Sequence, residues 1–340
     1  MPRCRSVCRS FILRFALLLA AVFLVAGCKR QGSHAGQADP YACAPDEFSV
    51  MTFNLGRYCL DDRDGDGQKN DPKPENERQA VVGLIAATHP DVLAIIEIGS
   101  PAVFEEFRSA LQNAGLIFPF TEYLQRGRSE INMAVLSRFP ITDRQPHTDD
   151  TYSIGPAEIP VLRGFVEVEI EPAQGYRFRL LLAHLKSKVF HQLGQTEMRR
   201  NEARLLNKHV RRLLKENPEA NLLVVGDFND TYRSAALREI TGDKGQYLLD
   251  LRPEDSEGDA WTEFARSSDQ YTRIDYILAS RGMMNEAVPS KTRAVRDSKT
   301  YLASDHRPIM AVFKTHDVQV ATAVEKKTNT SAMAVETETD

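Results

Sequence analysis

Three features are scarce in this 340-residue chain, and each scarcity argues against a class of protein. A large excess of one charge is missing: 43 Lys and Arg against 47 Asp and Glu give a net charge of −4, which offers no general attraction for nucleic acid. Cysteines number five, and no Cys- or His-rich cluster occurs in the core of the sequence, which argues against a zinc site. The apolar run at residues 15–25 is shorter than the ~20 residues of a membrane span.

The N-terminus has the pattern of an export signal. Arginines precede the apolar run, and small residues then lead to Cys28 in the order Val-Ala-Gly-Cys. This ending resembles the bacterial lipobox, which implies a signal peptide over residues 1–27 and lipid on Cys28. We therefore expect an exported protein, anchored to a bacterial membrane through that lipid. An ordinary signal peptide or a transmembrane anchor is the alternative.

The remaining chain divides by composition. Residues 28–45 are mostly Gly, Ser, Gln, Ala and Pro and predict a flexible tether, whereas residues 315–340 lack a core pattern and predict disorder. Between them, residues 46–314 alternate strand-like and helix-like segments, which indicates one layered α/β domain. Cys43 and Cys59 remain after the signal, and export permits a disulfide between them. The sequence does not decide whether they pair.

The segment NLLVVGDFND at residues 221–230 gives the first indication of a functional site. Its apolar first half predicts a strand that is buried on both faces. After Gly226 it becomes abruptly polar, with Asp227 and Asn229 around a phenylalanine. Such a strand delivers charged groups to the rim of a sheet, where function concentrates.

Polar residues occur at the ends of other apolar strands in the same way. Each has a simpler interpretation alone: Asn54 as a turn former, Glu97 as the partner of an arginine, His184 as a core residue. Eight such positions together favour a shared site, and their oxygen atoms suit Mg²⁺ or Mn²⁺. The eight are Asn54, Glu97, His184, Asp227, Asn229, Asp275, Asp305 and His306.

Two further segments have both a functional and a simpler interpretation. Asp62, Asp64 and Asp66 match the first half of an EF-hand loop, but Lys73 stands at the twelfth position, where a glutamate is needed. We expect a solvated acidic loop, with Ca²⁺ bound in the loop at 62–73 as the alternative. The helix predicted over residues 197–215 carries many arginines, which predicts a solvated basic face or, alternatively, a contact with a polyanion.

The order of the motifs resembles the endonuclease/exonuclease/phosphatase superfamily. TFN, a strand ending in Glu97, HLKSK, GDFND, RIDYIL and SDHRPI follow one another across residues 47–314. The resemblance implies a four-layer αββα sandwich, in which two mixed β-sheets pack face to face between helices. It also implies a divalent-metal-dependent phosphodiesterase whose catalytic domain spans residues 46–314.

The resemblance assigns a role to each matching residue. Glu97 would bind the metal, Mg²⁺ or Mn²⁺, with Asn54 and Asp305 completing the site. His306 would be the general base, oriented by Asp275. The remaining residues would handle the water and the phosphate: Asp227 positions the attacking water, Asn229 and Arg163 hold phosphate oxygens, and His184 donates to a phosphate oxygen or to the leaving group.

The motifs indicate the reaction more firmly than the substrate. The LKSK run after His184 resembles secreted bacterial deoxyribonucleases, so we expect a nuclease acting on DNA or RNA. A lipid or small-phosphoester hydrolase, similar to a sphingomyelinase or an inositol phosphatase, is the first alternative. A catalytically inactive binding lipoprotein is the second. No protein partner is inferred.

Overall fold

The computed structural model describes residues 39–127 and 129–318. The predicted signal peptide, the predicted lipidation site Cys28, and most of the predicted tether and C-terminal tail lie outside the described residues. From Tyr41 onward the chain forms one compact unit. None of the helices in the described part is long and apolar enough to cross a membrane. Cys43 and Cys59 are both free thiols.

Two six-stranded sheets form the centre of the described domain. The first sheet has the order β15 (Arg293–Ala294), β16 (Ile309–Lys314), β1 (Glu47–Tyr58), β2 (Val92–Ile98), β4 (Asn132–Ser137) and β3 (Phe120–Leu124). The second has the order β11 (Leu249–Asp250), β14 (Asp275–Ala279), β10 (Leu222–Asp227), β9 (Tyr176–His184), β8 (Phe165–Ala173) and β5 (Ile141–Arg144). Both sheets are mixed, because β1 runs parallel to β2 and β10 runs parallel to β9, whereas the other pairs are antiparallel.

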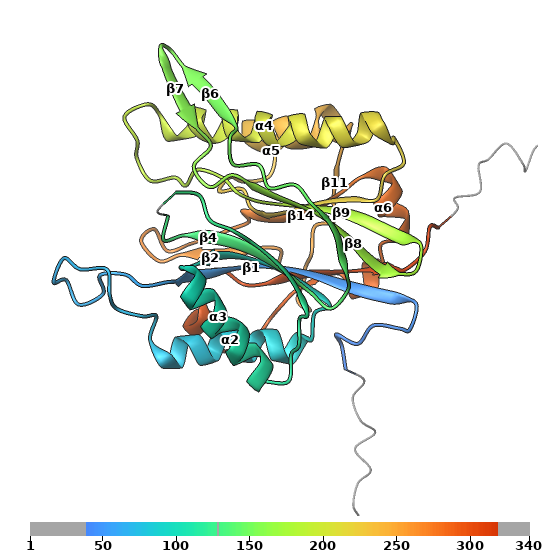
Figure 1. Cartoon of the computed structure of the whole chain (residues 1–340), viewed down its shortest axis with the longest axis horizontal. Coiled ribbons are helices and arrows are strands. Elements are labelled where there is room, and N and C mark those ends of the chain that lie inside the picture. Colours follow the sequence, from blue (N-terminus) through green and yellow to red (C-terminus); the bar gives the residue numbers. More distant parts are fainter. Residues whose placement is uncertain (1–38, 128, 319–340) are drawn as a thin grey trace, which may run out of the picture. The chain divides into compact units, whose positions relative to one another are not determined.

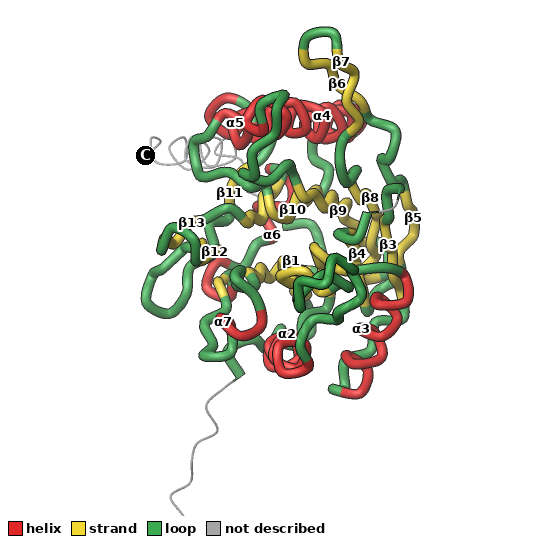
Figure 2. Tube along the Cα trace, turned by 90° about the vertical axis from the view of Figure 1, so that its left-hand side faces the viewer, coloured by secondary structure: helices red, strands yellow, loops and turns green. Residues whose placement is uncertain are grey.

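Helices cover the outer face of each sheet (Figures 1 and 2). The first sheet carries α2 (Glu75–Thr88), α3 (Pro101–Asn113) and the short α7 (Thr300–Ala303), and the second carries α4 (Gln195–Glu216) and α5 (Ala235–Thr241). Met283 of α6 (Arg281–Glu286) joins the core between the sheets. The predicted four-layer αββα sandwich is therefore confirmed.

The continuous apolar strands follow from this layering. In β2, Val92, Ala94 and Ile96 face the core between the sheets, whereas Leu93 and Ile95 face the helices. Because successive side chains of a strand point to opposite faces, a strand buried on both sides is apolar at most positions. Polar residues in such a strand are therefore concentrated near its ends.

Short elements complete the domain around the sandwich. Two small hairpins are formed by β6 (Thr151–Ile154) with β7 (Ala157–Pro160), and by β12 (Glu263–Ala265) with β13 (Gln270–Thr272). Two single-turn 3₁₀ helices are η1 (Asp243–Gly245) and η2 (Pro289–Lys291).

The apolar patterns of the sequence predict strands over residues 161–170 and 271–278, and the structure corrects both boundaries. Residues 271–278 are not one strand: the chain leaves the small β12–β13 hairpin and enters the second sheet only at Asp275. The strand predicted over 161–170 begins at Phe165, so Arg163 lies in the preceding loop. The cause is Gly164, whose φ is +71° and whose missing Cβ would lie 2.5 Å from the His147 carbonyl oxygen. This left-handed position interrupts the extended chain.

The two ends of the described domain lie at the same edge of the first sheet. Glu47 at the start of β1 pairs with Lys314 at the end of β16, and Thr315 donates its N–H to the carbonyl of Asp46. The polar ends of these strands, at Asn54 and just before Ile309, lie at the opposite edge. The chain therefore enters and leaves the domain away from the predicted catalytic rim (Figure 1).

Candidate active site

Three of the predicted residues lie side by side at the edge of the second sheet. Asp227, the last residue of β10, is paired with His184 of β9 on one side and with Asp275 of β14 on the other. The parallel strands end at this edge and the antiparallel strand begins there, so the register alone brings one imidazole and two carboxylates together. All three side chains are buried.

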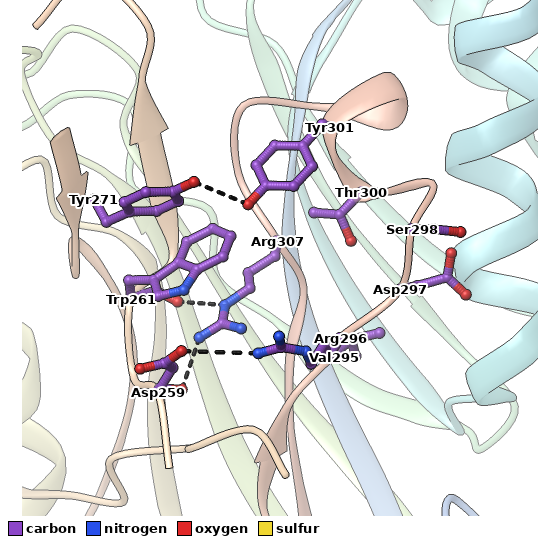
Figure 3. Close-up of a pocket in the computed structure, with 10 residues that line it drawn as sticks. All are labelled: Asp259, Trp261, Tyr271, Val295, Arg296, Asp297, Ser298, Thr300, Tyr301 and Arg307. Carbon is purple, nitrogen blue, oxygen red and sulfur yellow. Dashed lines mark hydrogen bonds and ion pairs between the residues drawn. The ribbon is translucent and has the colours of Figure 1, made fainter. Parts of the chain in front are cut away.

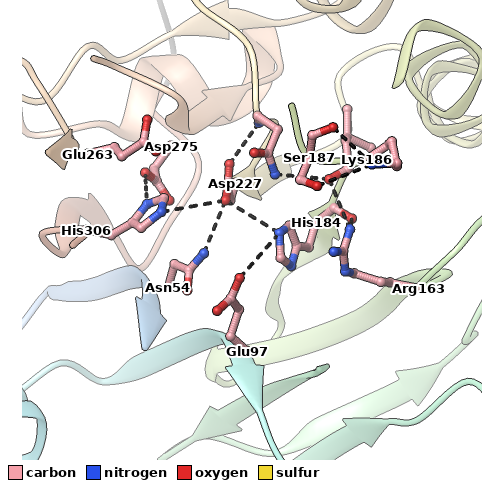
Figure 4. Close-up of polar contacts among 12 residues, drawn as sticks. Asn54, Glu97, Arg163, His184, Lys186, Ser187, Asp227, Glu263, Asp275 and His306 are labelled. Carbon is pink, nitrogen blue, oxygen red and sulfur yellow. Dashed lines mark hydrogen bonds and ion pairs between the residues drawn. The ribbon is translucent and has the colours of Figure 1, made fainter. Parts of the chain in front are cut away.

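The first sheet contributes Asn54 and Glu97 through irregular backbone. The β1–β2 pairing shifts register between Asn54 and Tyr58, and Glu97 has a positive φ of 66°. The N–H of Arg57 donates to Glu97 Oε2 over 2.8 Å. Left-handed backbone at a non-glycine residue is costly and concentrates at functional sites, where it redirects a side chain. The irregular segment thus turns the Glu97 carboxylate toward the second sheet (Figure 4).

Contacts between the sheets join these groups into one cluster. Asn54 Nδ2 donates to Asp227 Oδ2 over 3.1 Å. His184 Nε2 lies 3.5 Å from the same carboxylate oxygen and 3.9 Å from Glu97 Oε1. The predicted water-positioning and metal-binding residues therefore lie within reach of one another (Figure 4).

His306 is held between two carboxylates. Its Nδ1 lies 2.8 Å from Asp275 Oδ2, and its Nε2 lies 4.0 Å from Asp227 Oδ2. Its backbone N–H donates to Ser304 Oγ over 3.0 Å, which fixes the start of the loop. Burial by itself lowers the pKa of His306, but the charges of Asp275 and Asp227 outweigh burial and raise the pKa well above its usual value.

The Asp227 carboxyl has an unusual electrostatic environment. Burial, together with the neighbouring charge of Asp275, raises its pKa to about 7. The N–H of Asn229 donates to Asp227 Oδ1 over 2.8 Å and partly offsets this increase. A carboxyl group that titrates near neutrality beside a buried histidine is a frequent property of catalytic sites.

His184 is kept neutral by its surroundings. Burial, and then the charges of Arg163 and His306, lower the pKa of His184 well below its usual value. Its Nδ1 is buried and has no hydrogen-bond partner among the described residues. A buried polar atom without a partner is costly and points to a ligand that completes the site.

The two remaining phosphate-binding candidates are tied to the β9–α4 loop. Arg163 Nη1 donates to the carbonyls of His184 and Leu185 over 3.3 and 3.1 Å. Asn229 Nδ2 donates to the Leu185 carbonyl over 3.0 Å. Both side chains therefore brace the backbone that carries His184, so each reaches a phosphate only with its remaining N–H groups.

Asp305 and Glu97 line the same open cavity, of about 520 Å³. Asp305 is exposed, unlike its neighbours Ser304 and His306, and accepts a hydrogen bond from Ser304 over 3.3 Å. Carboxylate and amide oxygens are the hard donors that Mg²⁺ and Mn²⁺ prefer. Glu97 and Asp305 in this cavity, together with the buried Asn54 of β1, are therefore of the chemical types that fit a divalent cation of this class. Separately, ligand atoms of Asp227, Asp275 and His306 lie within 4.8 Å of one another.

Lys73 is a site residue that the sequence did not identify. Its side chain is 5% exposed, and its ammonium group donates to the Gly56 carbonyl over 2.7 Å and pairs with Glu77 over 3.3 Å. It lines the catalytic cavity and anchors the irregular end of β1. In the sequence, Lys73 stands out only because it occupies the position where a calcium loop needs a glutamate. Glu263, which the sequence also did not identify, forms a β-bridge with His306.

The two lysines after His184 differ in their surroundings. Lys186 is buried and donates to the Ser187 and Val189 carbonyls, so it holds its own loop together. Lys188 is half-exposed and lies 3.9 Å from Glu263. Only Lys188 is free to extend from the rim toward a phosphate.

The acidic loop has the predicted exposed character. Ligand atoms of Asp62, Asp64 and Asp66 lie within 4.8 Å of one another, and all three residues are exposed. Their carboxylates accept backbone N–H groups of the same loop. Lys73 points into the catalytic cavity and supplies no carboxylate, so Ca²⁺ in this loop stays a prediction.

Much of the basic face of α4 is occupied. Arg200 and Arg204 both pair with Glu239, and Arg212 pairs with the buried Glu167. The helix covers the outer face of the second sheet, while the catalytic residues lie at the edge of that sheet. These arginines therefore stabilise the helix packing, and they no longer support a contact with a polyanion.

Comparison with known proteins identifies the family. Residues 51–306 match the model of the Endonuclease/Exonuclease/phosphatase family. The chain belongs to this family. Its members are hydrolases of phosphoester bonds that depend on divalent metal ions. No curated protein matches the chain in sequence.

Solved structures of several members share the fold. The catalytic domain of human Nocturnin has a TM-score of 0.58 at 15% identity, covering 80% of this chain and 96% of that one. An endonuclease/exonuclease/phosphatase from Bacteroides vulgatus has a TM-score of 0.55 at 17% identity, with coverages of 79% and 98%. Sphingomyelinase C from Streptomyces griseocarneus has a TM-score of 0.54 at 16% identity, with coverages of 79% and 99%. At these identities the likeness concerns the fold alone.

Proposed function

We propose that this family member is an exported, lipid-anchored phosphodiesterase that hydrolyses DNA or RNA with Mg²⁺ or Mn²⁺. The arrangement of Asp275, His306 and Asp227 carries this proposal. Asp275 contacts His306 Nδ1, so the opposite nitrogen, Nε2, faces Asp227 across 4.0 Å. A water molecule bound between Nε2 and Asp227 would donate one proton to each, which orients its oxygen for attack.

Proton transfer follows from this geometry. His306 Nε2 takes the proton of the water during attack on phosphorus, and Asp275 stabilises the imidazolium that forms. The second proton remains shared with Asp227. General-base assistance of this kind typically contributes about 10²–10⁴-fold.

The other rim residues act on the phosphate. A divalent ion held by Glu97, Asn54 and Asp305 would neutralise negative charge on the phosphodiester as a Lewis acid. His184 and Asn229 would donate to phosphate oxygens from the opposite side of the cavity, where their hydrogen bonds stabilise charge that develops in the transition state.

An aromatic wall beside the cavity supports a nucleic-acid substrate. Tyr271 and Tyr301 are 53% and 43% exposed, and their hydroxyl groups lie 3.2 Å apart. Trp261 packs edge-on against Tyr271 with ring centroids 4.7 Å apart (Figure 3). These rings line a cavity of about 820 Å³, and Tyr301 also lines the catalytic cavity. Exposed aromatic rings beside a phosphodiester site suit stacking on bases.

A lipid phosphodiester is a second candidate, because one loop near the site is unusually apolar. Val189 and Phe190 are 72% and 79% exposed. They follow Lys188, which contacts Glu263 across the rim. Exposed apolar residues beside a lysine could also contact a bilayer surface. We favour nucleic acid because the aromatic wall directly adjoins the catalytic cavity.

A substrate panel tests the proposal. Purified protein should nick plasmid DNA or cleave RNA with Mg²⁺ or Mn²⁺, and EDTA should abolish the cleavage. Sphingomyelin vesicles and inositol phosphates should be poor substrates. Metal-dependent turnover of lipid alone would replace the nuclease assignment, whereas no turnover of any substrate would favour the inactive binding protein. Labelling with a radioactive fatty acid, lost in Cys28→Ser, tests the lipid anchor.

A further inference from the structure

Two histidines that are far apart in the sequence lie against each other on the helix-covered side of the second sheet. His147, between β5 and β6, and His209, on α4, stack with ring centroids 3.6 Å apart and an interplanar angle of 23°. Asp150 lies beside them, and its Oδ2 is 2.6 Å from His209 Nε2. One ligand atom from each of these three residues lies within 4.8 Å of the other two. The catalytic mechanism uses none of them.

A buried carboxylate orients one of the imidazoles. Glu167 is fully buried, and its Oε2 lies 2.8 Å from His147 Nε2. Arg212 and Arg179 also pair with Glu167, over 2.7 and 3.3 Å, so the charge of this carboxylate is balanced without a proton on His147. With Nε2–H donating to Glu167, His147 Nδ1 keeps its lone pair. A histidine whose far nitrogen donates to a carboxylate is the usual arrangement behind a metal ligand.

The surrounding backbone is already fixed. The main chains of His147 and Phe165 exchange two hydrogen bonds, of 2.9 and 3.0 Å, and the Asp150 carbonyl accepts the N–H of Val161 over 2.9 Å. The His147, His209 and Asp150 side chains are 17%, 12% and 17% exposed, so an ion would be largely shielded from solvent.

We propose that His147, His209 and Asp150 bind a zinc ion that fastens the 147–150 segment to α4. Two imidazole nitrogens and one carboxylate oxygen are donors that Zn²⁺ accepts in a tetrahedral site, with water as the fourth ligand. Mg²⁺ and Ca²⁺ prefer oxygen ligands alone, so this site differs in chemistry from the catalytic rim. The ion replaces the His209–Asp150 hydrogen bond, and the His209 ring turns about its side-chain bonds to direct Nε2 toward it, while His147 keeps its contact with Glu167.

Calorimetric titration of Zn²⁺ into metal-stripped full-length protein, with excess Mg²⁺ present, tests the site. Wild type should bind one Zn²⁺ that Glu97→Gln still binds, because Glu97 belongs to the catalytic rim. His209→Gln and Asp150→Asn should each weaken this binding by at least about tenfold, and Glu167→Gln by about 10–100-fold. His89→Asn is the matched control: it removes an exposed histidine from a left-handed helix cap that asparagine tolerates, and it should bind as wild type.

X-ray absorption at the zinc edge of the wild-type complex should show two imidazole ligands. Circular dichroism establishes whether each variant is folded. If His209→Gln does not fold, Asp150→Asn provides the test. Absence of a saturable site in wild type, or equal Zn²⁺ affinity in folded Asp150→Asn and wild type, would overturn the proposal. Because no readout depends on catalysis, the outcome is independent of the proposed function.

Discussion

Asp227 and Asp275 are directly paired across two neighbouring strands, and His306 contacts Asp275 while facing Asp227. Two buried carboxylates at one register position repel each other, which is part of why the pKa of Asp227 is raised to about 7. The imidazole between them is correspondingly stabilised in its charged form.

Replacing His306 with alanine should reduce kcat by at least about a hundredfold, because the group that accepts the proton of the water is removed. The fold should persist, since the loop is also held by Ser304 Oγ, which donates to the Asn54 carbonyl over 2.9 Å. Steady-state kinetics with circular dichroism would measure both effects. Activity near that of wild type in the folded variant would exclude His306 as the base.

Asp275→Asn should shift the pH profile of kcat/KM. A base must be deprotonated to act, so activity rises with pH through the pKa of His306, which Asp275 helps to raise. Removing that charge lowers the pKa, and the acid limb should move toward lower pH even as the maximal rate falls. The pH profile of kcat/KM, measured at saturating Mg²⁺, tests this shift. If the acid limb does not move, a group other than His306 controls it.

Tyr301→Ala should raise KM for an oligonucleotide by about 5- to 150-fold, because stacking of one base on an aromatic ring contributes about 1–3 kcal/mol. Turnover of bis(4-nitrophenyl) phosphate, which lacks bases, should change little. Tyr301→Phe is the control, since it keeps the ring and removes only the hydroxyl bonded to Tyr271. Equal losses on both substrates would mean that Tyr301 supports the rim and does not bind bases.

Gly226→Ala should destabilise the protein by at least about 3 kcal/mol, through overpacking combined with backbone strain. Gly226 has a φ of +133°, and an added Cβ would lie 2.0 Å from the Ala183 carbonyl oxygen in the neighbouring strand. Gly175→Ala is the comparison: its φ is +81° but nothing lies within 4 Å, so it should cost only about 1–2 kcal/mol. Urea unfolding midpoints would measure the difference, and equal midpoints would contradict it.

The sequence predicts well those site residues that stand at the end of an apolar strand. Asn54, Glu97, His184 and Asp227 all end apolar runs, and a strand buried on both faces accepts polar side chains mainly near its ends. The sandwich itself followed from the resemblance of the ordered motifs, not from hydrophobic periodicity. The error at Arg163 shows the limit, because Gly164 interrupts a run that is otherwise uniformly extended.

Residues whose role depends on tertiary contacts were not predictable. Lys73 looked like a defect in an acidic loop, yet its ammonium group supports the backbone beside the catalytic cavity. His147 and His209 gave no signal, because neither ends an apolar run and neither belongs to the motifs that resemble the superfamily. Their proximity arises only once α4 packs on the second sheet. The sequence pattern predicts which side chains reach the edge of a sheet, whereas tertiary packing determines which side chains come into contact.

Both ends of the described domain lie at the same edge of the first sheet, and this position affects how a substrate reaches the catalytic residues. Tyr41 lies thirteen positions after Cys28, a reach of at most ~45 Å at about 3.3–3.6 Å per residue. A lipid at Cys28 would thus keep the enzyme close to the bilayer while the tether joins the domain at the edge opposite the catalytic residues. If the protein is anchored in this way, each cut in a polymeric substrate would be made by an enzyme that stays at the membrane surface.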